Sequence, residues 1–315
     1  MSAAIGVDIG GTKIAAGLVA DDGSILDAAN APTPASADDI ARVVVDLVEQ
    51  LDGEHEIDGV GIGAAGFVDA DRATIRFAPN IEWRDAPLAA QVRELLDVPV
   101  IVENDANVAA WGEYRFGAGE DVDDLLLVTV GTGIGGGIVH GGQLFRGSYG
   151  FAAEIGHMRV VPDGILCGCG QHGCWEQYAS GRALVREARR HVSEADRAAA
   201  PLAEKVEGDI ERITGPMVTE LAQAGDELCI ALFAEVGRWL GEGIATLSAI
   251  LDPSVIAFGG GVAAAGDLLL VPATSAFEEH LTAREYRTPA TLRLAKLGND
   301  AGLIGAADLV RSEPV

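Results

Sequence analysis

Apolar residues follow two spacings along the chain, and the alternation of these spacings predicts a mixed α/β fold. Short continuous apolar runs, of the length of buried strands, lie at residues 5–9, 14–19, 60–63, 98–102, 125–130 and 255–258. Apolar residues recur at helical spacing in 40–51, 106–114, 228–251 and 301–310. The longest helical pattern ends at Asp252-Pro253, because proline cannot continue a helix.

Two segments of the chain resemble each other. Val7-Asp8-Ile9-Gly10-Gly11-Thr12 is echoed by Val128-Thr129-Val130-Gly131-Thr132-Gly133, and each is a strand pattern that runs into a glycine turn. Two such units predict a duplicated fold whose halves face each other. Residues 193–215, in contrast, are weakly patterned, and we interpret them as a surface excursion with little catalytic content.

The first glycine turn lies between two predicted strands. Rossmann and P-loop motifs open a helix, so this position argues against both. A Gly10-Gly11-Thr12 turn can instead present backbone N–H groups and a hydroxyl to an anion. Asp8 at the strand end could hold Mg²⁺, and Lys13 adds a cation.

The second turn, around Gly131, Thr132 and Gly133, has five glycines in residues 131–137, which suggests close approach of a ligand. A tight hairpin is the alternative interpretation of either turn. Because the two turns echo each other, we favour the binding of nucleotide phosphates. Gly260 and Gly261 follow a later strand and could add a third backbone surface near an adenosine.

Asp105 lies in Glu103-Asn104-Asp105-Ala106-Asn107, where a buried strand meets a helix. An Asp there could accept a proton from a substrate hydroxyl that attacks phosphorus. The segment taken alone favours a helix N-cap, and both roles can coexist if Asn104 or Asn107 caps the helix while Asp105 reacts.

Cysteine spacing gives the most specific chemical signal. Three of the four cysteines are Cys167, Cys169 and Cys174, and His157 precedes them. Three thiolates and one imidazole form a closed tetrahedral set that is typical of structural zinc. His172 is an alternative ligand to His157. A closed site would organise the protein and leave the chemistry to other residues.

Composition limits the possible partners. The 315 residues carry a net charge of −26 with three lysines, which excludes a general binder of nucleic acid and argues against anionic membranes. No apolar run reaches the roughly 18 residues of a membrane span, the N-terminus is unlike a secretory signal, and the cysteine cluster suits a reducing cytoplasm. An acidic surface poor in lysine suggests a cytoplasm rich in salt.

These motifs together resemble the ROK family of sugar kinases and repressors, particularly its actinobacterial-type ATP-dependent glucokinases. The resemblance extends from the Asp8 turn through the cysteine segment to Leu297-Gly298-Asn299-Asp300-Ala301-Gly302-Leu303. It implies an actin-like ATPase (duplicated ribonuclease H-like) fold with two lobes around a central cleft. The smaller domain would comprise residues 1–110 and 299–315, and the larger domain, with the zinc, residues 111–298.

The resemblance also implies phosphorylation of the 6-hydroxyl of glucose by ATP, with Mg²⁺ and a structural Zn²⁺. Asp105 would be the catalytic base, and the sugar ligands would be Gly66, Asn80, Asn104, Asp105, Glu154, His157 and Glu176. Each of these polar residues singly is also typical of a surface or capping position. We expect a cytoplasmic homodimer or homotetramer.

Four alternatives remain at this stage. Another hexose kinase of the family, acting on N-acetylmannosamine, mannose or fructose, would differ in one or two sugar contacts. A polyphosphate-using glucokinase is disfavoured by Lys13 and by the acidic surface. A sugar-responsive regulator would need a DNA-binding domain, for which we expect no room before the first strand. A sugar-binding protein without chemistry would lack Asp105.

Overall fold

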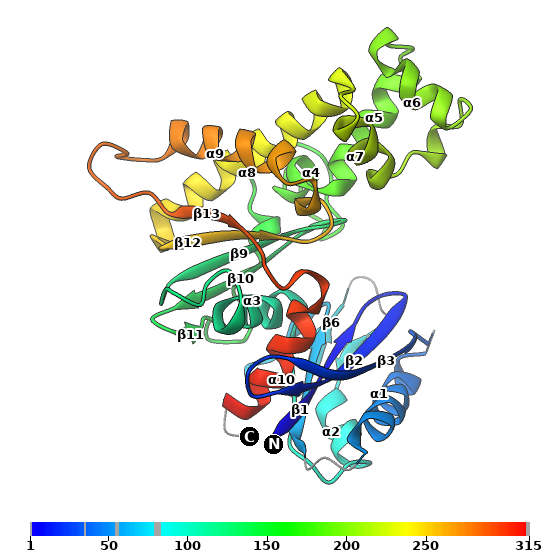
Figure 1. The fold of residues 1–315 in the computed structure, drawn as a ribbon, viewed down its shortest axis with the longest axis vertical. Coiled ribbons are helices and arrows are strands. Elements are labelled where there is room, and N and C mark those ends of the chain that lie inside the picture. Colours follow the sequence, from blue (N-terminus) through cyan, green and yellow to red (C-terminus); the bar gives the residue numbers. More distant parts are fainter. Residues whose placement is uncertain (1, 35, 54–56, 79–82, 313–315) are drawn as a thin grey trace. The chain divides into compact units, whose positions relative to one another are not determined.

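The computed structural model describes residues 2–34, 36–53, 57–78 and 83–312, and its contacts divide the chain into two compact units. Unit 1 comprises Met1–Leu127, Gly136–Ala153 and Ala295–Val315, and unit 2 comprises Val128–Gly135 and Glu154–Leu294. The chain therefore passes between the units more than once, and the C-terminal segment returns to unit 1. Figure 1 labels the elements.

The first sheet belongs to unit 1 and has the strand order β3-β2-β1-β4-β8. Its strands are β1 (Ala3–Ile9), β2 (Lys13–Ala20), β3 (Ile25–Pro32), β4 (Ile57–Ala64) and β8 (Val100–Asn104). β1 pairs antiparallel with β2 and parallel with β4, and β4 pairs parallel with β8. The carboxyl ends of β1, β4 and β8 therefore lie at the same end of the sheet, which is where Asp8 and Asn104 are found.

Helices cover both faces of the first sheet. They are α1 (Ala37–Asp52), α2 (Leu88–Arg93), α3 (Asp105–Phe116) and α10 (Ala301–Ser312). On one face, Ile5, Val7 and Ile9 form a core with α1 residues such as Val44. The alternate residue of β1, Gly6, faces α10 on the other side.

The second sheet repeats the connectivity of the first. Its order is β11-β10-β9-β12-β13, with β9 (Leu125–Val130), β10 (Ile134–His140), β11 (Gln143–Leu144), β12 (Val255–Gly259) and β13 (Thr291–Leu294). Each sheet is built on a hairpin, β1-β2 in the first and β9-β10 in the second. The next strand in the chain, β3 or β11, pairs with the second strand of the hairpin, and two later strands, β4 and β8 or β12 and β13, extend the sheet beyond its first strand. This shared order confirms the duplication that the two glycine-turn motifs predict.

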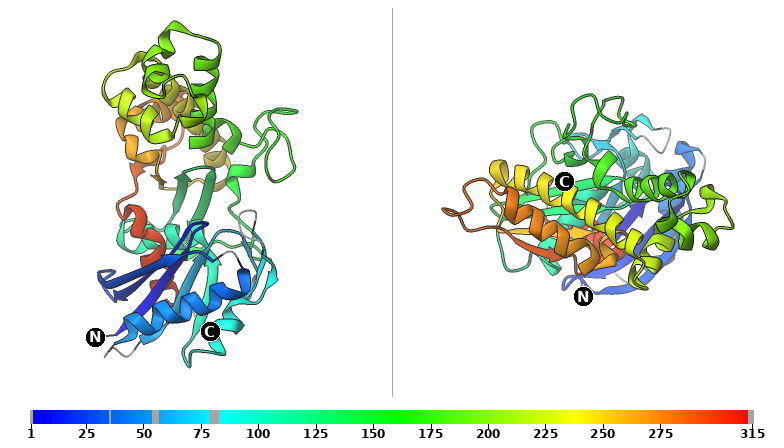
Figure 2. Two further views of the ribbon diagram at one scale, coloured as in Figure 1. Left: turned by 90° about the vertical axis from the view of Figure 1, so that its right-hand side faces the viewer. Right: turned by 90° about the horizontal axis from the view of Figure 1, so that it is seen from above.

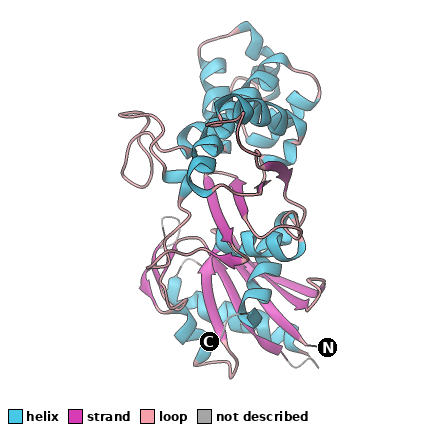
Figure 3. Ribbon diagram, turned by 90° about the vertical axis from the view of Figure 1, so that its left-hand side faces the viewer, coloured by secondary structure: helices cyan, strands magenta, loops and turns pink. Residues whose placement is uncertain are grey.

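Helices make up most of unit 2 and are drawn in cyan in Figure 3. They are α4 (Glu176–Ala179), α5 (Gly181–Ser193), α6 (Ala200–Lys205), α7 (Gly215–Gln223), α8 (Glu227–Leu251) and α9 (Asp267–His280), with short 3₁₀ turns at Ile155–His157, Arg197–Ala199, Ile210–Arg212 and Ala263–Ala265. α8 and α9 pack side by side, as Figure 2 shows. α8 ends at Leu251, with Asp252 as its C-cap before Pro253, as its sequence predicts.

The sequence missed several elements whose periodicity is weak. A small sheet in the order β5-β6-β7 (Phe67–Val68, Ile75–Phe77 and Arg84–Ala86) lies after β4. Its strands are too short to show a pattern. α9 was also missed, because Pro272 lies inside it. A 3₁₀ turn at Gly298–Asp300 leads into α10.

The units divide the chain differently from the predicted domains. Residues 111–127, 136–153 and 295–298 belong to unit 1, whereas the family resemblance implies the larger domain for them. The physical reason is that α3 packs against α10: Trp111 Nε1 and an Arg115 guanidinium nitrogen each donate to Asp308 Oδ2 at 2.7 Å. That the units act as the two lobes of one enzyme stays a proposal.

Close backbone contacts hold α10 in place. A Cβ on Gly6 would lie 1.9 Å from the Leu303 carbonyl oxygen, and one on Gly61 would lie 1.8 Å from that of Ala306. On the neighbouring side, a Cβ on Gly305 would lie 1.8 Å from the Val108 carbonyl oxygen. Only glycine allows the helix to approach β1, β4 and α3 this closely.

Within the described ranges, none of the helices combines the length and the hydropathy that a membrane span requires.

We predict that Gly61→Ala lowers the free energy of unfolding by about 3 kcal/mol, because the new methyl group would overlap backbone that cannot yield. Gly17→Ala is the matched control, since it lies in the same sheet and its Cβ would be 3.6 Å from the nearest atom, a Leu303 side-chain carbon. Urea unfolding of both variants measures the difference. Equal loss of stability in the two variants would contradict the close packing of α10.

Candidate functional site

The corner between β8 and α3 places an amide and a carboxylate side by side in unit 1. Asn104 is the N-cap of α3, and its Oδ1 accepts hydrogen bonds from the N–H groups of Ala106 (2.9 Å) and Asn107 (3.1 Å). Its Nδ2 donates to the carbonyl oxygen of Gly66 (3.1 Å). Asn104 therefore does the capping, which leaves Asp105 as the first residue of the helix.

Asp105 and Asp8 form an acidic pair in unit 1. Asp105 is an exposed residue, but the protein packed around its carboxyl partly desolvates it, and this desolvation raises its pKa. Burial, and secondly the charge of Asp105, raise the pKa of Asp8 to about 6, while Lys13 acts in the opposite direction. The carboxylate oxygens of such a pair suit a bound Mg²⁺, whose charge would relieve the repulsion.

The start of α10 lies against Asp8. A Cβ on Gly302, in the first turn of that helix, would be 3.6 Å from Asp8 Cγ. The positive end of the helix dipole therefore faces this carboxylate. Sequence reasoning noted the segment 297–303 as a motif but gave Gly302 no part in the site. The missing signal was tertiary, because these residues are far apart in the chain.

The first glycine turn is a tight hairpin with an open outer face. The Gly10 N–H donates to the Lys13 carbonyl oxygen at 3.0 Å, and the Gly10 carbonyl accepts from the Thr33 hydroxyl at 2.6 Å. A Cβ on Gly11 would meet nothing within 4 Å, and Gly11, Thr12 and Lys13 are exposed. The hairpin interpretation is thus correct for the backbone, and the exposed face is open to an anion.

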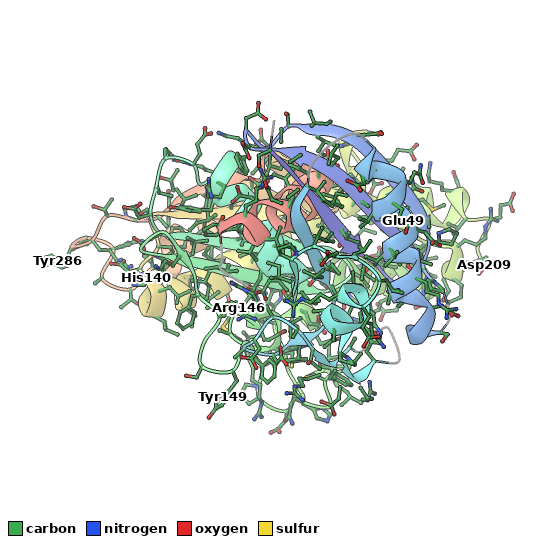
Figure 4. The ribbon with its side chains drawn as sticks, turned by 90° about the horizontal axis from the view of Figure 1, so that it is seen from below. Glu49, His140, Arg146, Tyr149, Asp209 and Tyr286 are labelled. Carbon is green, nitrogen blue, oxygen red and sulfur yellow. The ribbon has the colours of Figure 1, made fainter. Side chains whose placement is uncertain are left out.

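A buried ionic network lies directly behind the β8–α3 corner, and sequence reasoning missed it. Glu103 is fully buried and accepts hydrogen bonds from Arg72 Nε (3.0 Å) and Asn107 Nδ2 (3.0 Å), and it forms an ion pair with Arg146. Arg146 also donates to the carbonyl oxygens of Asp69 and Ala70, both at 2.8 Å. Nearby Tyr149, in contrast, projects outward with 76% of its surface exposed (Figure 4).

The second glycine turn belongs to unit 2, where two other segments contact it. The Gly131 carbonyl accepts from the N–H of Gly181 at the start of α5 (2.8 Å). Gly260 has a φ of +84°, and a Cβ there would lie 2.6 Å from the Val130 carbonyl oxygen. The second glycine turn, the N-terminus of α5 and residues 260–262 therefore converge.

These three segments border a cavity of about 880 Å³. Gly131, Thr132 and Gly261 line it together with α5 residues, and α7 supplies Pro216, Thr219 and Glu220. Gly133 and Gly260 shape the neighbouring backbone and are not among the lining residues. Sequence reasoning missed the contribution of α5 and α7, because α5 is mostly polar and α7 has only nine residues.

Four ligand atoms gather in the cysteine segment of unit 2. The donor atoms of His157, Cys167, Cys169 and Cys174 all lie within 4.8 Å of one another. His157 Nδ1 is 3.7 Å from Cys167 Sγ, and the sulfurs of Cys169 and Cys174 are 3.6 Å apart. A tetrahedral Zn²⁺ with bonds of about 2.3 Å needs ligand atoms about 3.7 Å apart, so the residues fit the ion. His172 instead contacts the Gly164 carbonyl oxygen at 2.9 Å.

Two thiols of this cluster, those of Cys167 and Cys174, are shifted toward their neutral form. Burial raises the pKa of the Cys167 thiol to about 12 and also raises that of Cys174. Zn²⁺ would reverse this effect, because its charge stabilises the thiolates. The segment between Val160 and Cys174 carries no helix or long strand (Figure 3), so side-chain ligands are well suited to hold it.

Glu176 connects the metal cluster to the second glycine turn. Its Oε1 accepts a hydrogen bond from the Cys167 thiol (3.1 Å), and its Oε2 would lie 2.5 Å from a Cβ on Gly133. Glu154 precedes the 3₁₀ turn that carries His157, and its carbonyl accepts from the His157 N–H (3.1 Å). A side chain at 133 would therefore displace the Glu176 carboxylate from its present position.

The predicted site residues divide between the two units. Unit 1 contains Asp8, Gly10, Gly11, Thr12, Lys13, Gly66, Asn104 and Asp105. Unit 2 contains Gly131, Thr132, Gly133, Glu154, His157, Cys167, Cys169, Cys174, Glu176, Gly260 and Gly261. Asn80 lies outside the described residues. Within each unit, residues distant in sequence come together.

Known proteins resemble this chain along its whole length. The ROK family model matches residues 4–313. A glucokinase from Streptomyces coelicolor is 48% identical over 311 residues, which cover 99% of this chain and 98% of that protein. An N-acetylmannosamine kinase from Escherichia fergusonii is 34% identical and covers 98% of both chains.

A solved structure of a ROK family protein also resembles this chain over nearly its whole length. The crystal structure of a ROK family glucokinase from Streptomyces griseus, in complex with glucose and AMPPNP, matches with a TM-score of 0.89 and 50% identity, covering 99% of this chain and all of that one. The fold class is thus the predicted actin-like ATPase fold. With a family model that matches nearly every residue, this chain belongs to the ROK family.

Proposed function

We propose that the protein is a glucokinase, which transfers the γ-phosphoryl group of ATP to the 6-hydroxyl of D-glucose. The observation that carries the proposal is the Asn104–Asp105 corner, in a chain that is 48% and 50% identical to two Streptomyces glucokinases. The products would be glucose 6-phosphate and ADP. Mannose, fructose and N-acetylmannosamine are weaker candidates, because the kinase named for the last is 34% identical.

The cavity of unit 2 supports a nucleoside triphosphate as the donor. Its lining includes apolar residues such as Leu184 and Val262, which suit a base and a ribose, and also Arg182, Arg186 and Arg189, which can pair with a phosphate. The second glycine turn and the N-terminus of α5 lie at its border, and the helix contributes the positive end of its dipole there, although its first N–H groups already donate to oxygens of Gly131, Thr132 and Ser180. We therefore assign the adenosine to this cavity and the phosphates to the glycine turns with Lys13.

In this mechanism Asp105 accepts the proton of the sugar 6-hydroxyl while the hydroxyl oxygen attacks the γ-phosphorus in line. The bond from that phosphorus to the β,γ-bridging oxygen breaks, and ADP leaves with its electron pair. A raised pKa improves Asp105 as a base for an alcohol. Mg²⁺, when bound near Asp8, would neutralise charge on the phosphates.

We assign the sugar hydroxyls to Gly66, Asn80, Asn104, Asp105, Glu154, His157 and Glu176. Carboxylates and amides offer the paired acceptors and donors that a polyol requires. The structural Zn²⁺ would orient His157 through one ring nitrogen and leave the other for the sugar. A homodimer or homotetramer in the cytoplasm remains our expectation.

A coupled assay of sugar phosphorylation tests the proposal. Glucose, mannose, fructose and N-acetylmannosamine are each offered with ATP and with polyphosphate. We expect the highest kcat/KM for glucose with ATP. Failure to phosphorylate glucose, or equal kcat/KM for all the sugars, would contradict it.

We predict that Asp105→Asn lowers kcat about 10²- to 10⁴-fold, because the amide cannot accept the proton. Glucose binding, measured by calorimetry, should remain. Because the folded protein holds the Asp105 proton more tightly than the unfolded chain, the contribution of this group to the free energy of unfolding falls as pH rises. The fall begins near the ordinary pKa of a carboxyl and ends above the raised pKa. The melting temperature at pH 7 should therefore be unchanged or higher in this variant. Wild-type turnover would exclude Asp105 as the base.

We predict that Cys169→Ser loses the bound metal and weakens glucose binding, because three ligands hold Zn²⁺ poorly and His157 loses its anchor. Metal content by mass spectrometry should fall from about one zinc ion per chain to well below one. Cys229→Ala is the control, since Cys229 is buried in α8, outside the cluster. Full zinc content in the Cys169 variant would refute the ligand set.

A further inference from the structure

The segment that the sequence left without a role is an ordered part of unit 2. Residues 194–214 connect α5 to α7 and contain α6 between two 3₁₀ turns. Ala199, Leu202, Val206 and Ile213 are each at most 1% exposed, so the segment has a small core of its own. Figure 1 shows it beside α5 and α7, and polar Asp209 lies at its outer surface in Figure 4. We call residues 194–214 the brace.

Arg189 on α5 ties the end of the brace. One terminal nitrogen of its guanidinium donates to Glu211 Oε2 (2.7 Å), and the other donates to the carbonyl oxygens of Glu211 (2.7 Å) and Ile213 (3.2 Å). A second ion pair joins Lys205, on α6, to Glu220 on α7, with oxygens at 3.0 and 2.9 Å. The brace is therefore fastened to both neighbouring helices.

The two helices that the brace fastens are walls of the cavity described above. Arg189 lines the cavity from α5, and Glu220 lines it from α7. Their partners Glu211 and Lys205 are not among the lining residues. Each ion pair thus joins one residue that lines the cavity to one residue of the brace that does not. Loss of either pair would let α7 move relative to α5. Replacing Lys205 would do so without removing a residue that lines the cavity.

We propose that the brace sets the spacing of α5 and α7 and so determines affinity for the nucleoside part of the phosphoryl donor, with Arg189 and Lys205 as positioning residues. This inference rests on the proposed function, since it assigns the nucleoside to this cavity. A base and ribose gain their binding free energy from close contact with both walls, so a wider cavity binds them less well. A ligand made only of phosphates would bind at the glycine turns, so we expect its affinity to be independent of the spacing between α5 and α7.

The experiment compares Arg189→Met, Lys205→Met and Arg190→Met in the full chain. Methionine keeps the apolar stem and removes the donors. Arg190 is the matched control, because it is on α5, does not line the cavity, and pairs with Glu187 and with Glu194 at the very start of the brace, one turn along the same helix. The readouts are KM for ATP, KM for glucose, and the inhibition constant of inorganic tripolyphosphate.

We expect KM for ATP to rise about tenfold in Arg189→Met and about twofold to fivefold in Lys205→Met, from the loss of charged hydrogen bonds and of one exposed ion pair. KM for glucose and the tripolyphosphate constant should stay at wild-type values, and Arg190→Met should match wild type throughout. Circular dichroism melting confirms that each variant is folded.

Two results would contradict the proposed role of the brace. An unchanged KM for ATP in both brace variants would show that the spacing does not depend on it. The second result is that Arg189→Met loses as much affinity for tripolyphosphate as for ATP while Lys205→Met keeps both. Arg189 would then be a cation that binds phosphate directly. A wild-type protein that neither binds nor uses ATP would contradict the proposed function itself, which distinguishes the two failures.

Discussion

The close approach of α10 to the first sheet is the constraint on which the candidate site in unit 1 depends. Gly6 and Gly61 leave room for helix backbone where any side chain would overlap carbonyl oxygens. This contact brings the first turn of α10 against Asp8, and the same helix holds α3 through Asp308. Because α3 begins at Asp105, one packing arrangement fixes both carboxylates. The residues involved come from both ends of the sequence, so the site in unit 1 requires that the C-terminal helix packs against the N-terminal sheet.

Electrostatics in this protein differ between the surface and the site. The chain carries a net charge of −26, yet the proposed donor is a polyanion. Local compensation resolves this conflict: Lys13, the helix N-termini and the N–H groups of the glycine turns provide positive potential where the phosphates would bind. Burial and the charge of Asp105 raise the pKa of Asp8, and desolvation raises the pKa of Asp105, so a divalent cation there would stabilise both carboxylates. Behind this corner, Glu103 is neutralised by Arg72 and Arg146, so the buried acid adds little to the repulsion.

How far the sequence predicted the site depended on the range of the interactions. The cysteines and His157 lie within eighteen residues, and the donor atoms that their spacing predicts do come together. The Asn104 cap was foreseen because capping is local. The Arg146–Glu103 pair and the Gly302–Asp8 contact were not foreseen, because they join segments with no sequence relation. The brace was missed for another reason: its helices are single turns or little more, so their apolar residues are too few to show a period.

The sequence by itself determined the α/β class, six of the thirteen strands and four of the ten α-helices in the described residues, the two glycine turns, the family motifs and the composition of the metal cluster. These features follow from local spacing, backbone propensity and residue chemistry, which are legible in a linear chain. Only the tertiary structure decided the boundaries of the compact units, the cavity between α5 and α7, and the ionic network behind Asp105. Those depend on which surfaces pack together, and a difference of one methyl group, as at Gly61, decides whether a helix can approach a sheet.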